Sequence, residues 1–173
     1  VAAVVVVAAA LGYSLYYFYS SGSAEKGIVV CNPQDPSECL WQDHIHALVL
    51  ISIDGVVQGL PTEKGPLAEG HTHEERNVMH WHSSVPYDPV KREIIDESSL
   101  TLESSLRSAG VELPEGGRLF VKKASVWERR DEYGGYVWSD RDIIFVAKDG
   151  RSDGETLAYL QAANINLPYL GAG

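Results

Sequence analysis

Positive charge is scarce in this 173-residue chain, which has 14 lysines and arginines against 24 aspartates and glutamates and a formal net charge of −10. The acidic residues are spread along the sequence rather than gathered in a tail. Binding of nucleic acid requires a basic surface that neutralises phosphates, and this composition does not supply one. The composition therefore excludes nucleic acid as a partner.

Charge is absent altogether from Val1–Ser20, a run of small and β-branched residues that ends in tyrosines and a phenylalanine. About twenty apolar residues cross a bilayer as a helix, and tyrosine rings suit the membrane interface. We expect 1–20 to form a transmembrane or hydrophobic anchor helix. A cleaved signal peptide is the alternative, but its apolar core is usually shorter and ends in small residues.

Cysteine is limited to Cys31 and Cys39, which bracket a short proline-containing loop beyond the anchor. Such a pair can form a disulfide in an oxidising compartment. Two free thiols, or thiols that bind a soft metal such as Cu(I), are the alternatives. Together with the anchor, the pair favours an extracytoplasmic domain that is joined to the membrane by a linker over 21–42.

Histidine is lacking outside one stretch of the chain, and all six histidines fall into three His-x-His pairs. The pairs are His44 and His46, His71 and His73, and His80 and His82. Residues i and i+2 of a β-strand point to the same face, so each pair presents two imidazoles together. Neutral imidazole binds Cu(II), Zn(II) and Ni(II), and copper outcompetes zinc at an unbiased nitrogen site. The pattern predicts a metal site in which all six histidines take part, with copper favoured and zinc the alternative.

Six imidazoles exceed the needs of one tetrahedral zinc, so either two ions bind or some histidines orient the others. Nearby carboxylates that could orient imidazoles or complete the coordination are Asp43, Glu74 and Glu75, with solvated surface charge as the alternative. Trp41 and Trp81 could shield the site or belong to the core. Met79, the only methionine, adjoins His80 and should face the opposite side of a strand, so we assign it to the core.

Two known histidine motifs do not match. Cupins need a glutamate three or four residues beyond the His-x-His and a glycine after it, but those positions hold Asn77 and its neighbours beyond His73, and Pro86 and Tyr87 beyond His82. A zinc-protease His-Glu-x-x-His fails because Asn77 stands where the second histidine is needed. No distinct general base or nucleophile motif is present, so an enzyme is the weaker hypothesis.

The hydrophobic fraction of 45% and the chain length suit one domain of α+β class. Residues 43–150 should form a β-rich domain, and 151–173 a C-terminal extension with helical character at Glu155–Ala163. The elements expected in the domain are a strand at His44–Ile53 with a hairpin turn at Asp54–Gly55, a loop at Gly59–Gly70, a turn at 74–77 within His71–Ser83, a helix at Ser98–Ala109, and strands at Arg118–Trp127 and Tyr136–Ala147. A hairpin followed by one helix and further strands is the order of β-grasp folds, with an antiparallel β-sandwich as the alternative.

The motifs His44-Ile-His46-Ala47, Ile53-Asp54-Gly55 and His71-Thr72-His73-Glu74, together with His80 and Thr101-Leu102, carry a resemblance. Through these motifs, residues 43–149 resemble a group of uncharacterised prokaryotic membrane-anchored extracytoplasmic proteins. The resemblance implies a shared histidine site rather than a particular reaction. The chain departs from the group by adding Trp81-His82 and by lengthening the Glu128–Gly135 region, so His82 is the ligand that the resemblance supports least.

Three functions agree with these features. The favoured one is a membrane-anchored extracytoplasmic metal-binding module, which could be an accessory subunit of a membrane complex or form a homo-oligomer. The second is a pilin-like filament subunit, because such subunits also place a hydrophobic N-terminal helix ahead of a β-rich head. The third is a metal-dependent enzyme, which would need an open coordination position and a substrate cleft.

Overall fold

The computed structural model describes residues 27–167, so the predicted anchor at 1–20 lies outside the described residues. Within the described range, none of the helices has the length and apolarity of a membrane span. The strands are β1 (Ile28–Cys31), β2 (Cys39–Ile53), β3 (Val56–Gln58), β4 (Val78–Asp88), β5 (Glu93–Ile94), β6 (Arg118–Lys123), β7 (Val126–Arg130) and β8 (Asp142–Lys148). The helices are the 3₁₀ turn η1 (Ser98–Leu100), α2 (Leu102–Ser108) and α3 (Asp153–Ala163).

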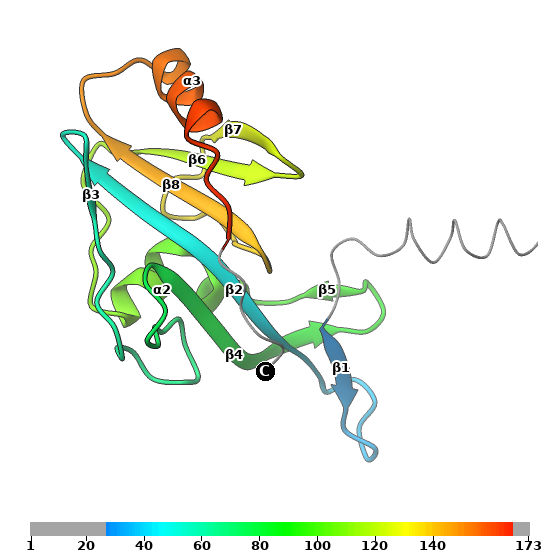
Figure 1. The fold of residues 1–173 in the computed structure, drawn as a ribbon. Helices are drawn as coiled ribbons and strands as arrows, with labels where there is room; N and C mark the ends of the chain where they lie inside the picture. The colour runs from blue at the N-terminus through cyan, green and yellow to red at the C-terminus, as the bar shows by residue number, and fades with distance from the viewer. Residues whose placement is uncertain (1–26, 168–173) are drawn as a thin grey trace, which may run out of the picture.

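The strands form one curled mixed sheet in the order β5-β4-β2-β8-β6-β7, with β1 and β3 also paired to β2 (Figure 1). At its centre β2 and β8 run parallel, whereas the other pairs are antiparallel. The predicted α+β class is therefore confirmed for the described residues. The antiparallel sandwich is wrong, because one continuous sheet with a parallel central pair takes its place.

The long strand β2 has 15 residues and begins at Cys39, before the predicted start at His44. It ends at the predicted turn, where Asp54 and Gly55 both have positive φ, 50° and 81°, as a type I′ hairpin turn requires. At its other end β2 pairs with β1, and a disulfide joins Cys31 to Cys39. Within the proposed linker, Ile28–Cys31 and the residues from Cys39 onward therefore belong to the sheet, as a hairpin that the disulfide closes.

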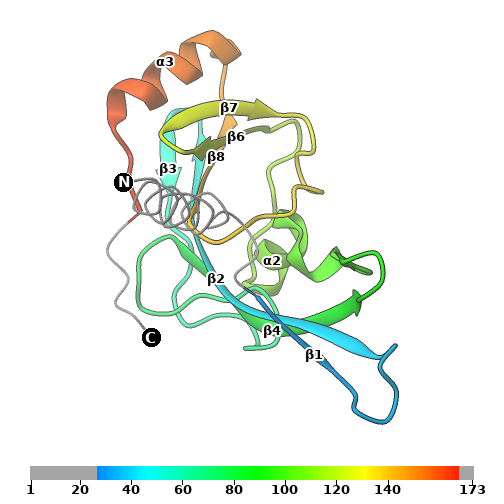
Figure 2. The ribbon, with the colours of Figure 1, turned by 90° about the vertical axis from the view of Figure 1, so that its right-hand side faces the viewer.

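Alternate residues of the sheet fill two cores. On one face, α2 packs its buried Leu102 and Leu106 against odd-numbered residues of β2 such as Ala47. On the other face, α3 packs Leu160 against Leu48 of β2 and neighbouring apolar residues. Figure 2 shows α3 beyond β7 and α2 well apart from it, beside β2. The even-numbered face of β2 before Leu48, which carries His44 and His46, is not part of either core.

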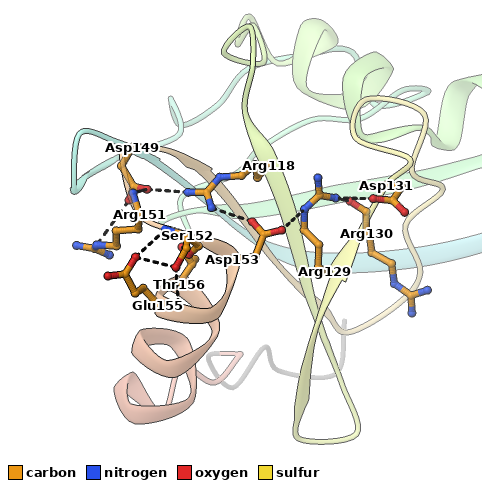
Figure 3. Close-up of polar contacts among 10 residues, drawn as sticks. All are labelled: Arg118, Arg129, Arg130, Asp131, Asp149, Arg151, Ser152, Asp153, Glu155 and Thr156. Atoms are coloured by element: carbon orange, nitrogen blue, oxygen red, sulfur yellow. Dashed lines mark hydrogen bonds and ion pairs between the residues drawn. The ribbon is translucent and has the colours of Figure 1, made fainter.

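Helix α3 confirms the helix predicted at Glu155–Ala163, and a capping box between Ser152 and Glu155 starts it at Asp153. An ion-pair network ties its first turn to the sheet (Figure 3). Arg118 of β6 contacts Asp149 and Asp153, each at 2.8 Å. The network holds the C-terminal extension on the domain.

Three further predicted elements differ from those observed. The helix expected at Ser98–Ala109 is interrupted at Thr101, whose extended backbone and side-chain oxygen cap α2 after the separate turn η1. The strand expected at Arg118–Trp127 is the hairpin of β6 and β7, because Ala124 and Ser125 adopt positive φ. The strand expected at Tyr136–Ala147 begins only at Asp142, after Arg141 with a φ of 67°.

Candidate metal centre

Two of the three histidine pairs lie side by side on β2 and β4. The register sets His44 opposite His82 and His46 opposite His80. Residues directly opposite in an antiparallel pair point to the same side, and the ring centroids of these pairs are 4.3 and 4.6 Å apart. Ile45, between the two histidines of β2, points into the opposite core. Four imidazoles therefore lie together on one face of the sheet.

The third pair forms a further row beside β4. His71 and His80 form an antiparallel bridge and exchange backbone hydrogen bonds of 2.9 and 2.8 Å. The ring of His73 lies 4.6 Å from that of His80 and 5.8 Å from that of His82. The turn predicted at 74–77 does return the chain in this way. We call the six clustered imidazoles the histidine face.

The loop that precedes His71 holds this third row in place. Gly70 lies directly against Ser105 of α2, where a Cβ atom would collide with the serine Cβ and Cα. The Thr72 hydroxyl donates to the carbonyl of Pro61 at 2.7 Å and accepts from the backbone N–H of Lys64 at 3.2 Å. The loop predicted from its glycines and prolines is therefore ordered by packing on α2, and it delivers His71 to the sheet.

The histidine face divides into two groups of three. The ligand atoms of His44, His46 and His80, the first triad, all lie within 4.8 Å of one another. The same holds for His71, His73 and His82, the second triad. Each triad combines residues from two segments of the chain, and each has the geometry to hold a metal ion. All six predicted ligands are therefore brought together.

His80 is the most buried member of the first triad, with 4% of its surface exposed. Its Nε2 is buried and has no hydrogen-bond partner among the described residues. The nearest acidic atom, Glu75 Oε2, is 3.6 Å away, too far for a hydrogen bond. A buried polar atom without a partner is destabilising, and a metal ion would satisfy the lone pair on this nitrogen.

His71 is oriented for metal binding through its Nε2. Its Nδ1 lies 2.8 Å from the carbonyl oxygen of Glu69, and a carbonyl only accepts, so Nδ1 carries the proton and donates. Nε2 is then left with a lone pair. Histidines that bind metals are commonly held in this way by a backbone carbonyl.

Burial favours the neutral form of four of the histidines by lowering their pKa values. Burial, followed by the charge of neighbouring imidazoles, lowers the pKa of His80 to about 3 and that of His82 to about 4. Burial also lowers the pKa of His46 and of His71. Metal binding requires the deprotonated ring, so protons compete little for these nitrogens at neutral pH.

The tryptophans and the methionine named from the sequence lie on the face opposite the histidines. Met79 is fully buried in the α2 core, as predicted, and Trp81 belongs to the same core. Trp41 stacks on Trp81 at 5.9 Å between centroids and so packs against that core rather than over the histidines. Asp43 accepts the backbone N–H of His44.

Two contributors to the site were not predicted. Asp140, in the loop before β8, lies 3.6 Å from Nδ1 of His46 and accepts its backbone N–H at 3.1 Å. The backbone carbonyl of Glu69 orients His71. Asp140 reaches the site because β8 pairs in parallel with β2, which the sequence alone does not reveal.

The histidine face is thus a set of nitrogen ligands with carboxylates beside one half. Such a set suits borderline transition metals.

Comparison of the chain with protein-family models, with curated proteins and with solved structures gives no match.

Proposed function

We propose that this protein is a membrane-anchored, extracytoplasmic module that binds a transition metal on its histidine face, with copper favoured and zinc the alternative. The observation that carries the proposal is the buried Nε2 of His80, which lacks a hydrogen-bond partner among the described residues although five other imidazoles surround it. Surface histidines gathered by accident would be satisfied by water. A buried imidazole nitrogen without a hydrogen-bond partner is what we expect of a metal ligand when no ion is bound.

Copper is favoured by the ligand set and by the compartment. Among divalent first-row ions, Cu(II) binds a given nitrogen site most strongly, and none of the six ligands is a thiolate. The disulfide between Cys31 and Cys39 supports an oxidising compartment, in agreement with an extracytoplasmic domain. The apolar run Val1–Ser20 supports the anchor.

The strand order supports a β-grasp-like fold, in which a hairpin, one helix and further strands end in a strand parallel to the first of the hairpin. Here β2 and β4 form the antiparallel pair, α2 follows, and the final strand β8 lies parallel to β2. This fold and the histidine motifs also agree with membership of the prokaryotic membrane-anchored group that the sequence resembles. The filament and enzyme hypotheses rest on the sequence alone, and no observation on residues 27–167 favours either.

The test is metal content after equilibrium dialysis. Metal-free full-length protein in detergent is dialysed against Cu(II) or Zn(II), and bound metal is measured by plasma mass spectrometry. We expect His44→Ala to lower metal content or affinity at least about tenfold. Gln42→Ala is the matched control, since Gln42 is exposed and precedes His44 on the same face of β2. Wild-type protein that folds normally and takes up neither metal would end the proposal.

A further inference from the structure

The two triads of the histidine face differ in the charge around them. In the first triad, Glu75 Oε2 lies 3.6 Å from Nε2 of His80, and Asp140 Oδ1 lies 3.6 Å from Nδ1 of His46. In the second triad, His71 is paired with a neutral backbone carbonyl. Within residues 27–167, no carboxylate forms an ion pair with His71, His73 or His82. The first triad is therefore a nitrogen site beside negative charge, and the second is a neutral nitrogen site.

The two triads are too close to be independent. The rings of His44 and His82, one from each triad, have centroids 4.3 Å apart. An ion bound at 2.0–2.1 Å lies roughly 3 Å from the centroid of its ligand ring, so ions in the two triads would be no more than about 10 Å apart. Two dications at that distance repel each other enough to weaken the second binding event roughly tenfold even at the dielectric constant of water.

A monovalent ion in the second triad lowers both the cost of desolvation and the repulsion from the first ion. The cost of removing an ion from water rises with the square of its charge, so a neutral, partly buried ligand set favours a monocation over a dication. The repulsion from a dication in the first triad is also halved. Imidazole is an accepted ligand of copper, and copper has a stable monovalent state.

We propose that the histidine face holds two ions of different charge, a divalent ion at His44, His46 and His80 and Cu(I) at His71, His73 and His82. The inference rests on the proposed function and assigns its ions. Glu75 serves the divalent position by its negative charge, because its carboxylate lies beside the buried nitrogen of His80. Glu74, the neighbouring exposed glutamate, makes no ion pair among the described residues.

The experiment titrates metal-free full-length protein with Zn(II), and separately with Cu(I) under anaerobic reducing conditions, each against a competing chelator. The matched variants are His44→Gln and His73→Gln, both at positions that are not fully buried. We expect His44→Gln to weaken Zn(II) binding at least about tenfold and Cu(I) binding less than threefold, and His73→Gln to do the reverse. Glu75→Gln should weaken only Zn(II), by roughly tenfold, whereas Glu74→Gln should change neither.

Three outcomes overturn the inference. If each histidine variant weakens both ions equally, the six imidazoles form one shared site, and metal binding itself still stands. If the preferences are reversed, the assignment of charge to the triads is wrong. If Glu75→Gln and Glu74→Gln behave alike, the carboxylate does not distinguish the positions. Wild-type protein that binds neither ion would instead end the proposed function, so the two failures are distinguishable.

Discussion

His71 Nε2 lies 3.1 Å from His82 Nε2, although the two residues are 11 positions apart in the sequence. Two nitrogens bound to one ion at 2.0–2.1 Å are roughly 2.9 to 3.4 Å apart for bond angles between 90° and the tetrahedral value. Because His71 donates through Nδ1 to the Glu69 carbonyl, its Nε2 presents a lone pair toward His82. The two rings therefore have the spacing of ligands to a common ion.

Replacing His80 by leucine should abolish binding at the first triad without destabilising the metal-free protein. The substitution removes a buried nitrogen that lacks a partner within the described part of the chain and fills the same space with apolar atoms. We expect the free energy of unfolding to stay the same or rise by about 1–2 kcal/mol in urea denaturation with chelator present. Trp81→Ala, at the adjacent core position, should cost about 3–5 kcal/mol. A loss above 2 kcal/mol for His80→Leu would show that His80 is structural.

Acid should destabilise the metal-free domain. The folded-state pKa values of His80, about 3, and His82, about 4, lie below the unfolded value of 6.5, so the unfolded chain binds more protons between these limits. The free energy of unfolding should be flat above pH 6.5 and fall below it, by up to about 1.4 kcal/mol per pH unit for each histidine. Urea denaturation at pH 7.5, 6.5 and 5.5 measures this, and His80→Leu should show a shallower fall. Equal stability at the three pH values would contradict the burial of these rings.

Asp140 should matter to metal affinity more than Asp43 does. Both carboxylates accept a backbone N–H from a histidine of β2, but Asp140 alone of the two lies near an imidazole, at 3.6 Å from His46 Nδ1. We expect Asp140→Asn to lower Zn(II) affinity roughly tenfold and Asp43→Asn to lower it less than threefold. Isothermal titration calorimetry measures both. Equal losses would mean that Zn(II) affinity depends on the overall negative charge of the domain and not on the contact between Asp140 and His46.

The C-terminal helix should depend on Arg118. This arginine, with 19% of its side chain exposed, joins Asp149 and Asp153, and its removal would leave the largely buried Asp149 carboxylate with the more exposed Arg151. We expect Arg118→Ala to lower the free energy of unfolding by about 1–3 kcal/mol. Arg107→Ala, which breaks an exposed pair with Glu103 on α2, should cost at most about 0.5 kcal/mol. Thermal or urea denaturation compares the two, and equal effects would mean that the network adds nothing beyond a surface ion pair.

The fold was predictable where the signal is local. Asp54–Gly55 specifies its turn through residues that tolerate positive φ, and the helix predicted at Glu155–Ala163 is present as α3, which begins two residues earlier. Ala124 and Ser125 make an equally tight turn without either signal, so one strand was predicted where the hairpin of β6 and β7 stands. The parallel pairing of β2 with β8 joins segments far apart in the chain, and local periodicity does not encode it.

The site was predictable from spacing because the period of a strand is two. His44 and His46 had to share a face, and so did His80 and His82. The division into triads was not predictable, since it depends on the register that sets His46 against His80 and His71 beside it. Asp140 was not predicted because its position beside His46 depends on the pairing of β8 with β2. Spacing identified the candidate ligands, and register determined how they group.

The most direct test of the account is a crystal structure of copper-loaded protein, with anomalous diffraction measured on both sides of the copper absorption edge. The account predicts anomalous peaks at the histidine face, about 2.0–2.1 Å from nitrogens of His44, His46 and His80 or of His71, His73 and His82. A well-ordered histidine face with no peak within bonding distance of these rings, in protein soaked with excess copper, would contradict it.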